Sequence, residues 1–180
     1  MRTLFLTSAA MLMMAGVAHA GPQYVDETNF AASGYDVVAY QSLEQVPVGQ
    51  PQAEAVPGNA SITADYNGAT WAFSTEENRD KFLADPAAYA PKYDGHCAYG
   101  VAQGGKVPGN PNLWRIVDGK LYLNITPTVA GFWEEDIPGQ IDTAESKWDS
   151  GLESNGASAK SWKAIDDNSG TYSTEAPSGG

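Results

Sequence analysis

The chain has 180 residues, of which 22 are acidic and 10 are basic, so its formal net charge at pH 7 is −12. This balance excludes nucleic acid and anionic membrane surfaces as partners, because both attract clustered lysine and arginine. It is compatible with the attraction of cations, and equally with the solvated surface of an exported protein.

The first residues have the pattern of a secretory signal peptide. Arg2 precedes a short apolar run, Leu4–Val17, and Ala18-His19-Ala20 places small residues at the two key positions of a cleavage site. The apolar run is too short to span a bilayer comfortably. We therefore expect residues 1–20 to be removed and the mature protein to be periplasmic or secreted, without membrane insertion.

Residues 21–32 follow as a lead-in without strong periodicity. The apolar run Tyr35–Tyr40 suits a strand or a short buried segment, and Asp36 is its one charged residue. Asp36 has two interpretations: it caps a turn or accepts backbone hydrogen bonds, or it lies beside His96 and Cys97 at a functional site. The proline-containing stretch Gln45–Ala60 is typical of a surface loop.

The most explicit folding pattern is Tyr66–Pro86. Asn67-Gly68 suits a tight type I′ turn and predicts a hairpin. After the turn, Trp71 and Phe73 alternate with smaller residues, as in a half-buried strand. Thr75 is a favourable N-cap for the helix that follows, and that helix ends before the proline.

A shorter version of this pattern recurs later in the chain. Leu113–Val117 and Leu121–Asn124 flank Asp118-Gly119, which predicts a second hairpin with the same turn chemistry. Thr126 caps the helix after it, and Ile141–Trp148 suits a further helix. The two patterns match over a short length, as an internal duplication would.

These elements predict a single α+β domain over residues 33–148. We expect one small antiparallel sheet built from the two hairpins, with helices packed on it. From residue 149 to 180 the composition changes to serine, glycine and aspartate, which predicts a disordered tail because little apolar surface is available for burial. The alternative for part of this tail is that a segment around Trp162 docks on the domain.

The stretch Trp71–Tyr89 reads WAFSTEENRDKFLADPAAY and resembles the core motif of the YHS domain family. The resemblance implies a small domain that binds metal. The family motif often carries two cysteines, which match Ser74 and Asn78 here, so metal binding does not carry over at these two residues. Gly34–Tyr40 and Gly95–Tyr99 resemble segments that flank the motif in a secreted branch of the family.

Without residues 1–20, His96 and Cys97 are the only histidine and the only cysteine of the sequence. A thiolate and an imidazole suit copper(I), zinc or a related soft metal ion. A closed site needs further ligands, from Asp36, Asp94, a tyrosine or a second subunit. The alternatives for Cys97 are a small buried hydrophobic residue, or an intermolecular or redox-active thiol. His96 alone is more typical of a hydrogen-bonded loop histidine.

Enzyme signatures are absent from the sequence, and we do not expect catalysis. We predict an exported YHS-type domain that binds or handles a soft metal ion such as copper(I), or a metal-containing cofactor. Cys97 is then the primary ligand, His96 the second and Asp36 an outer contributor. The alternative is a metal-free interaction module, in which aromatic residues recognise an envelope partner and Cys97 only packs. Oligomeric state and partner identity do not follow from the sequence.

Overall fold

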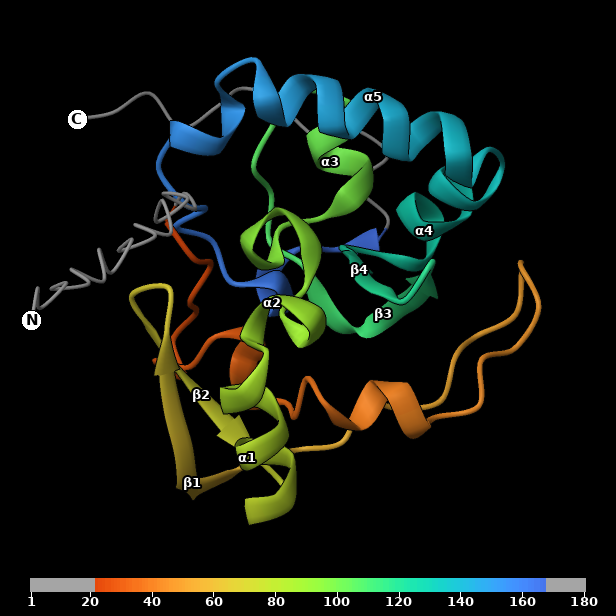
Figure 1. The fold of residues 1–180 in the computed structure, drawn as a ribbon. Coiled ribbons are helices and arrows are strands. Elements are labelled where there is room, and N and C mark those ends of the chain that lie inside the picture. The colour runs from red at the N-terminus through yellow and green to blue at the C-terminus, as the bar shows by residue number, and fades with distance from the viewer. Residues whose placement is uncertain (1–21, 168–180) are drawn as a thin grey trace, which may run out of the picture.

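The computed structural model describes residues 22–167 (Figure 1). The predicted signal peptide, residues 1–20, lies outside this range, so the expectation of export stays a prediction. Between residues 22 and 167, no helix is both long and apolar enough to cross a membrane.

Two units, each a hairpin followed by a helix, form most of the fold, and the predicted α+β class is confirmed. The first unit contains β1 (Asn59–Tyr66), β2 (Ala69–Phe73) and α1 (Glu76–Ala84). The second unit contains β3 (Asn110–Val117), β4 (Lys120–Asn124) and α4 (Pro127–Glu134). Figure 1 shows the two hairpins as separate bodies in the lower and middle parts of the molecule.

Each hairpin forms its own two-stranded sheet, so the prediction of one sheet built from both hairpins is wrong. The reason lies at the outer edges of β2 and β4. The Ala31 N–H donates to Thr70 O at 2.9 Å along β2, and Cys97 forms a parallel bridge with Leu123 along β4. Because each edge is occupied by the segment that leads into its own unit, β2 and β4 do not pair with each other.

The two tight turns predicted from the sequence are confirmed. Asn67 and Gly68 have φ angles of 51° and 72°, and Asp118 and Gly119 have φ angles of 48° and 74°. Positive φ at both central residues is the geometry of a type I′ turn. The strands of each hairpin therefore pair in the register that a two-residue loop dictates.

Helices α1 and α4 also begin in the same way, with a threonine side chain as the N-cap. The Thr75 side chain accepts the Asn78 N–H at 3.1 Å, and the Thr126 side chain accepts the Val129 N–H at 3.3 Å. Both threonines have extended backbone angles, as N-cap residues do. Both N-caps were predicted from the sequence, and both are confirmed.

The correspondence between the units also includes the segments that precede the hairpins. Ala32–Gly34 have φ angles of 47°, 53° and 79°, and Tyr93–Gly95 have 58°, 53° and 79°. Equivalent backbone hydrogen bonds follow in each unit: Gly58 N to Gly34 O and Asp36 N to Val56 O in the first, Gly109 N to Gly95 O and Cys97 N to Val107 O in the second. The two units thus follow the same backbone path, with Asp36 and Cys97 at equivalent positions.

The other helices lie before, between and after the two units. They are η1 (Ala32–Gly34), η2 (Ala39–Ser42), α2 (Pro86–Tyr89), η3 (Lys92–Gly95), α3 (Ala98–Ala102), α5 (Ile137–Asp149), η4 (Leu152–Ser154) and η5 (Trp162–Ala164). The helix predicted near Ile141–Trp148 is confirmed as part of α5. α3 was not anticipated, because its glycine-containing sequence has little periodicity.

One apolar cluster joins the two units. Trp71, Phe73 and Phe82 of the first unit pack with Trp114 and Leu123 of the second. The rings of Trp71 and Phe82 lie 5.2 Å apart, between centroids. A second cluster fills the space between the second hairpin and the helices above it, and includes Tyr93, Val101, Tyr122, Trp133 and Ala144.

The predicted disorder of the tail is wrong for residues 150–167, which we name the C-terminal strap. Lys106 Nζ donates to Glu153 O at 2.7 Å and to Asn155 O at 2.8 Å. Trp162 Nε1 donates to Ser33 Oγ at 2.9 Å, as the docking alternative anticipated. The strap is held largely by hydrogen bonds to its backbone, which composition does not reveal. Residues 168–180 lie outside the described range.

Candidate functional site

Asp36 is fully buried and its carboxylate is surrounded by donors. Oδ1 accepts the N–H groups of Val38 at 3.0 Å and Ala39 at 3.2 Å. Oδ2 accepts from Ser74 N at 2.8 Å, Ser74 Oγ at 2.6 Å and Asn78 Nδ2 at 2.7 Å. The two positions that match the family's cysteines are therefore hydrogen-bond donors to Asp36, and the carboxylate has the capping role that was one of its two interpretations.

His96 is also fully buried, and both of its ring nitrogens are engaged. Nδ1 lies 2.8 Å from Tyr93 O, to which it donates, and Nε2 accepts the Ser158 N–H of the strap at 3.1 Å. This pattern requires the neutral ring with its proton on Nδ1. Burial lowers the pKa of His96 to about 4, against a smaller opposing effect of the Tyr93 hydrogen bond. No lone pair of the ring is left for a metal ion.

Cys97 is the N-cap of α3. Its Sγ accepts the Gly100 N–H at 3.4 Å and donates to Asn124 Oδ1 at 3.5 Å. Burial raises the pKa of the thiol to about 12, although backbone N–H groups around the sulfur oppose the shift. Ile125 and Val129 pack on it. The group is a neutral thiol in an apolar setting, whereas a metal ligand must be a thiolate.

The structure does not bring the three predicted ligands together. Asp36 belongs to the first unit, and Cys97 holds the equivalent place in the second. Within residues 22–167, no group of three His, Cys, Asp or Glu side chains could hold a metal ion. Given the engaged nitrogens of His96 and the neutral thiol, these residues in this arrangement do not fit a metal ion.

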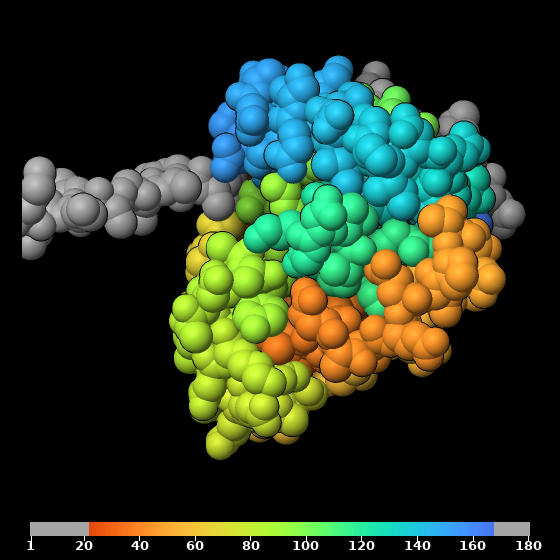
Figure 2. All heavy atoms as spheres, turned by 45° about the vertical axis from the view of Figure 1, so that its right-hand side comes forward, coloured from red at the N-terminus to blue at the C-terminus, as the bar shows by residue number. Residues whose placement is uncertain are grey.

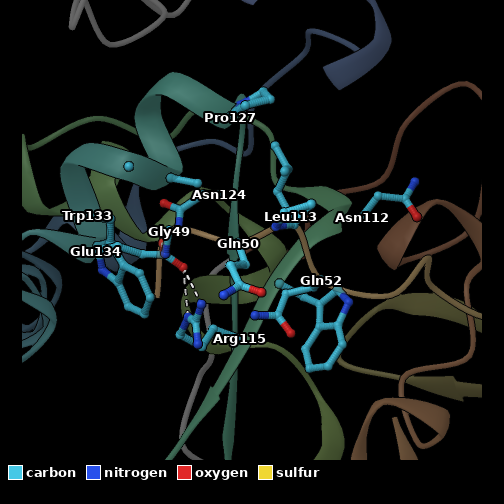
Figure 3. A pocket seen from close by; sticks show the side chains of 14 residues that line it. Gly49, Gln50, Gln52, Asn112, Leu113, Arg115, Asn124, Pro127, Trp133 and Glu134 are labelled. Atoms are coloured by element: carbon cyan, nitrogen blue, oxygen red, sulfur yellow. Dashed lines mark hydrogen bonds and ion pairs between the residues drawn. The ribbon is translucent and has the colours of Figure 1, made fainter. Parts of the chain in front are cut away.

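A cavity of about 290 Å³ lies elsewhere, against the second unit. Its wall combines residues 49–52 of the loop before β1, strands β3 and β4, and helix α4 (Figure 3). Figure 2 shows the loop, in orange, lying against the teal surface of the second unit. Sequence reasoning missed this cavity because its wall combines the loop at residues 49–52 with a stretch, residues 112–134, that lies about 60 residues further along the chain.

An ion pair at the cavity holds the loop in place. Arg115 Nε donates to Glu134 Oε1 at 2.8 Å, and Arg115 Nη1 donates to Val46 O at 3.1 Å. Glu134 Oε2 in turn accepts the Gly49 N–H at 2.8 Å. Figure 3 shows the two charged side chains facing each other across the cavity wall. Both charges are thus paired, and each also binds loop backbone.

Comparison with known protein families identifies the first unit. The family model of the YHS domain matches residues 54–93, which cover β1, β2, α1 and α2. That stretch is similar to the YHS domain, a type of domain generally associated with metal handling. No curated protein and no solved structure matches the chain. The second unit lies outside the matched residues although its backbone follows the same path.

Proposed function

We propose that this protein is an exported, metal-free binding module of the cell envelope, in which His96 and Cys97 serve the fold. The observation that carries the proposal is the engagement of both His96 ring nitrogens, one by Tyr93 O and the other by the Ser158 N–H. A buried imidazole with two hydrogen bonds must lose one of them before it can bind a metal ion, which costs on the order of 1–3 kcal/mol for the group left unsatisfied.

The surroundings of Cys97 support the same role. Its sulfur takes the place that the Asp36 carboxylate takes in the first unit, where the side chain caps the next turn. A thiol with a pKa of about 12 is almost wholly protonated at neutral pH. Burial is the main cause of this high pKa, because an apolar setting disfavours the charged thiolate. Cys97 therefore contributes as a cap and a packing residue.

A competition titration with a copper(I) chelator tests this proposal. We expect the wild-type protein and Cys97→Ala to leave the chelator fully loaded at equimolar protein. Asp65→Asn, an exposed carboxylate variant, controls for weak binding by the acidic surface. If the wild-type protein withdraws one equivalent of copper(I) and Cys97→Ala does not, the proposal is refuted.

The second candidate function is handling of a soft metal ion, and the YHS match over residues 54–93 favours it. In this function Cys97 and His96 bind copper(I) after the strap has released the imidazole. The variant Ser158→Pro lacks the N–H that occupies His96 Nε2, because proline has no backbone donor. If Ser158→Pro binds one equivalent of copper(I) and Ser158→Pro/Cys97→Ala does not, this second function replaces the first.

A further inference from the structure

Among the described residues that line the cavity beside α4, none carries an unpaired charge. Buried Arg115 and partly buried Glu134 form an ion pair, with side chains 6% and 15% exposed, and both also hydrogen-bond to the loop. A charged ligand would leave water without finding a counter-charge on the wall, which is unfavourable. Most of the remaining wall is apolar and includes Leu113, Pro127 and Ala130. The wall therefore selects an uncharged molecule.

Asn124 supplies a fixed donor at the same cavity. The residue is 3% exposed, and its Oδ1 accepts the Tyr99 N–H at 3.2 Å and the Cys97 thiol at 3.5 Å. These two donors determine which end of the amide is oxygen. Among residues 22–167, the hydrogen bonds of the Asn124 side chain all involve Oδ1, and Nδ2 is not one of the fully buried nitrogens, so it is accessible from the cavity that Asn124 lines. An N–H donor that faces the cavity and forms no bond to the described residues suits a ligand with an acceptor oxygen.

We propose that this cavity binds a small, uncharged organic molecule that places an apolar ring against the wall and a carbonyl oxygen on Asn124 Nδ2. Its volume of about 290 Å³ lies near the lower end for ligand pockets, which suits a molecule with a single ring. The proposal rests on the binding role proposed above and names the ligand class of that role. Cys97 then has a positioning role, because its thiol helps to orient the Asn124 amide.

Benzamide and benzoate are suitable probes, since they share shape and differ in charge. Titration of ¹⁵N-labelled full-length protein should shift the side-chain amide signals of Asn124 with benzamide. Benzoate should leave these signals unchanged at the same concentration. Equal shifts with both probes, shifts confined to residues outside the cavity wall, or no shift with benzamide would each refute the proposal.

Gly131→Leu tests the location, because Gly131 of α4 lines the cavity and a Cβ added there meets no described atom within 4 Å. We expect the Kd for benzamide to rise at least about tenfold, equivalent to about 1.4 kcal/mol. Gly156→Leu in the strap is the matched control, since its Cβ also meets open space. An unchanged Kd in Gly131→Leu would refute the proposal. Copper(I) takes no part in these titrations, so their failure and the failure of the proposed function are separate results.

Discussion

Replacement of Asp36 by asparagine tests the interpretation of this residue as a buried structural carboxylate. The change keeps the size of the side chain and removes one acceptor oxygen. Whichever way the amide turns, its NH₂ group faces N–H or O–H donors, either Val38 and Ala39 or Ser74 and Asn78.

The less costly orientation sacrifices the bonds from Val38 and Ala39, which are the longer ones at 3.0 Å and 3.2 Å. A hydrogen bond to a charged group contributes about 1.5–3 kcal/mol, so two lost bonds cost on the order of 3–5 kcal/mol when partial relaxation is allowed. This loss is a large fraction of the ~5–15 kcal/mol stability of an ordinary domain.

Urea denaturation followed by tryptophan fluorescence measures this difference. With an m-value of about 2 kcal/mol/M, the midpoint of Asp36→Asn should fall by roughly 1.5–2.5 M. Asp65→Asn is the matched control, because Asp65 is exposed and its replacement should change the free energy of unfolding by no more than about 0.5 kcal/mol, or the midpoint by roughly 0.25 M. A midpoint of Asp36→Asn equal to that of the wild type would show that the carboxylate does not hold these segments together.

The remaining predictions concern the strap, pH, the first turn and export. Truncation after Ser150 removes the anchors on Lys106 and Ser33 and should lower Tm by more than about 5 °C in calorimetry, or roughly 1 kcal/mol; an unchanged Tm contradicts the docked strap. Burial lowers the pKa of His96 to about 4 from 6.5 and raises the pKa of Asp94 to about 6 from 3.8. Between pH 4 and pH 6, the histidine is therefore protonated only in the unfolded state, and the aspartate is protonated only in the folded state. These effects oppose each other, and Asp94→Asn should therefore lose stability as pH falls from about 6.5 to about 4 more steeply than the wild type does; equal slopes in urea midpoints would contradict this. Gly68→Val places a β-branched residue at a φ of 72° and should cost on the order of 1–3 kcal/mol in the same assay; an unchanged midpoint would contradict the strain argued for this turn. Export with cleavage after Ala20 predicts that the intact mass of the secreted protein lacks residues 1–20; their retention would disprove it.

The sequence by itself determined the local elements of this protein. The turns at Asn67-Gly68 and Asp118-Gly119 follow from the residues that tolerate positive φ, and the helix starts follow from Thr75 and Thr126 as side-chain caps. Each of these features depends on neighbours within a few positions. Such short-range preferences are readable from the chain alone, and so was the YHS motif that contains the first of them.

Long-range pairing was decided only by the tertiary structure. The two hairpins do not share a sheet, because Ala31 and Cys97 occupy the strand edges of their own units. The strap docks because backbone groups meet Lys106 and His96, although its composition is polar. Hydrogen bonds of this kind leave no periodic pattern in a sequence.

At the candidate site, too, the sequence determined the kinds of side chain, and the tertiary structure decided whether they are available. Sequence reasoning selected Asp36, His96 and Cys97 for the chemistry of their side chains, and that chemistry is present. Whether a carboxylate, an imidazole or a thiol is available to a ligand depends on which partners already engage it. The packing of Ser74 on Asp36 and of Ser158 on His96 decided this, because burial makes those hydrogen bonds costly to break.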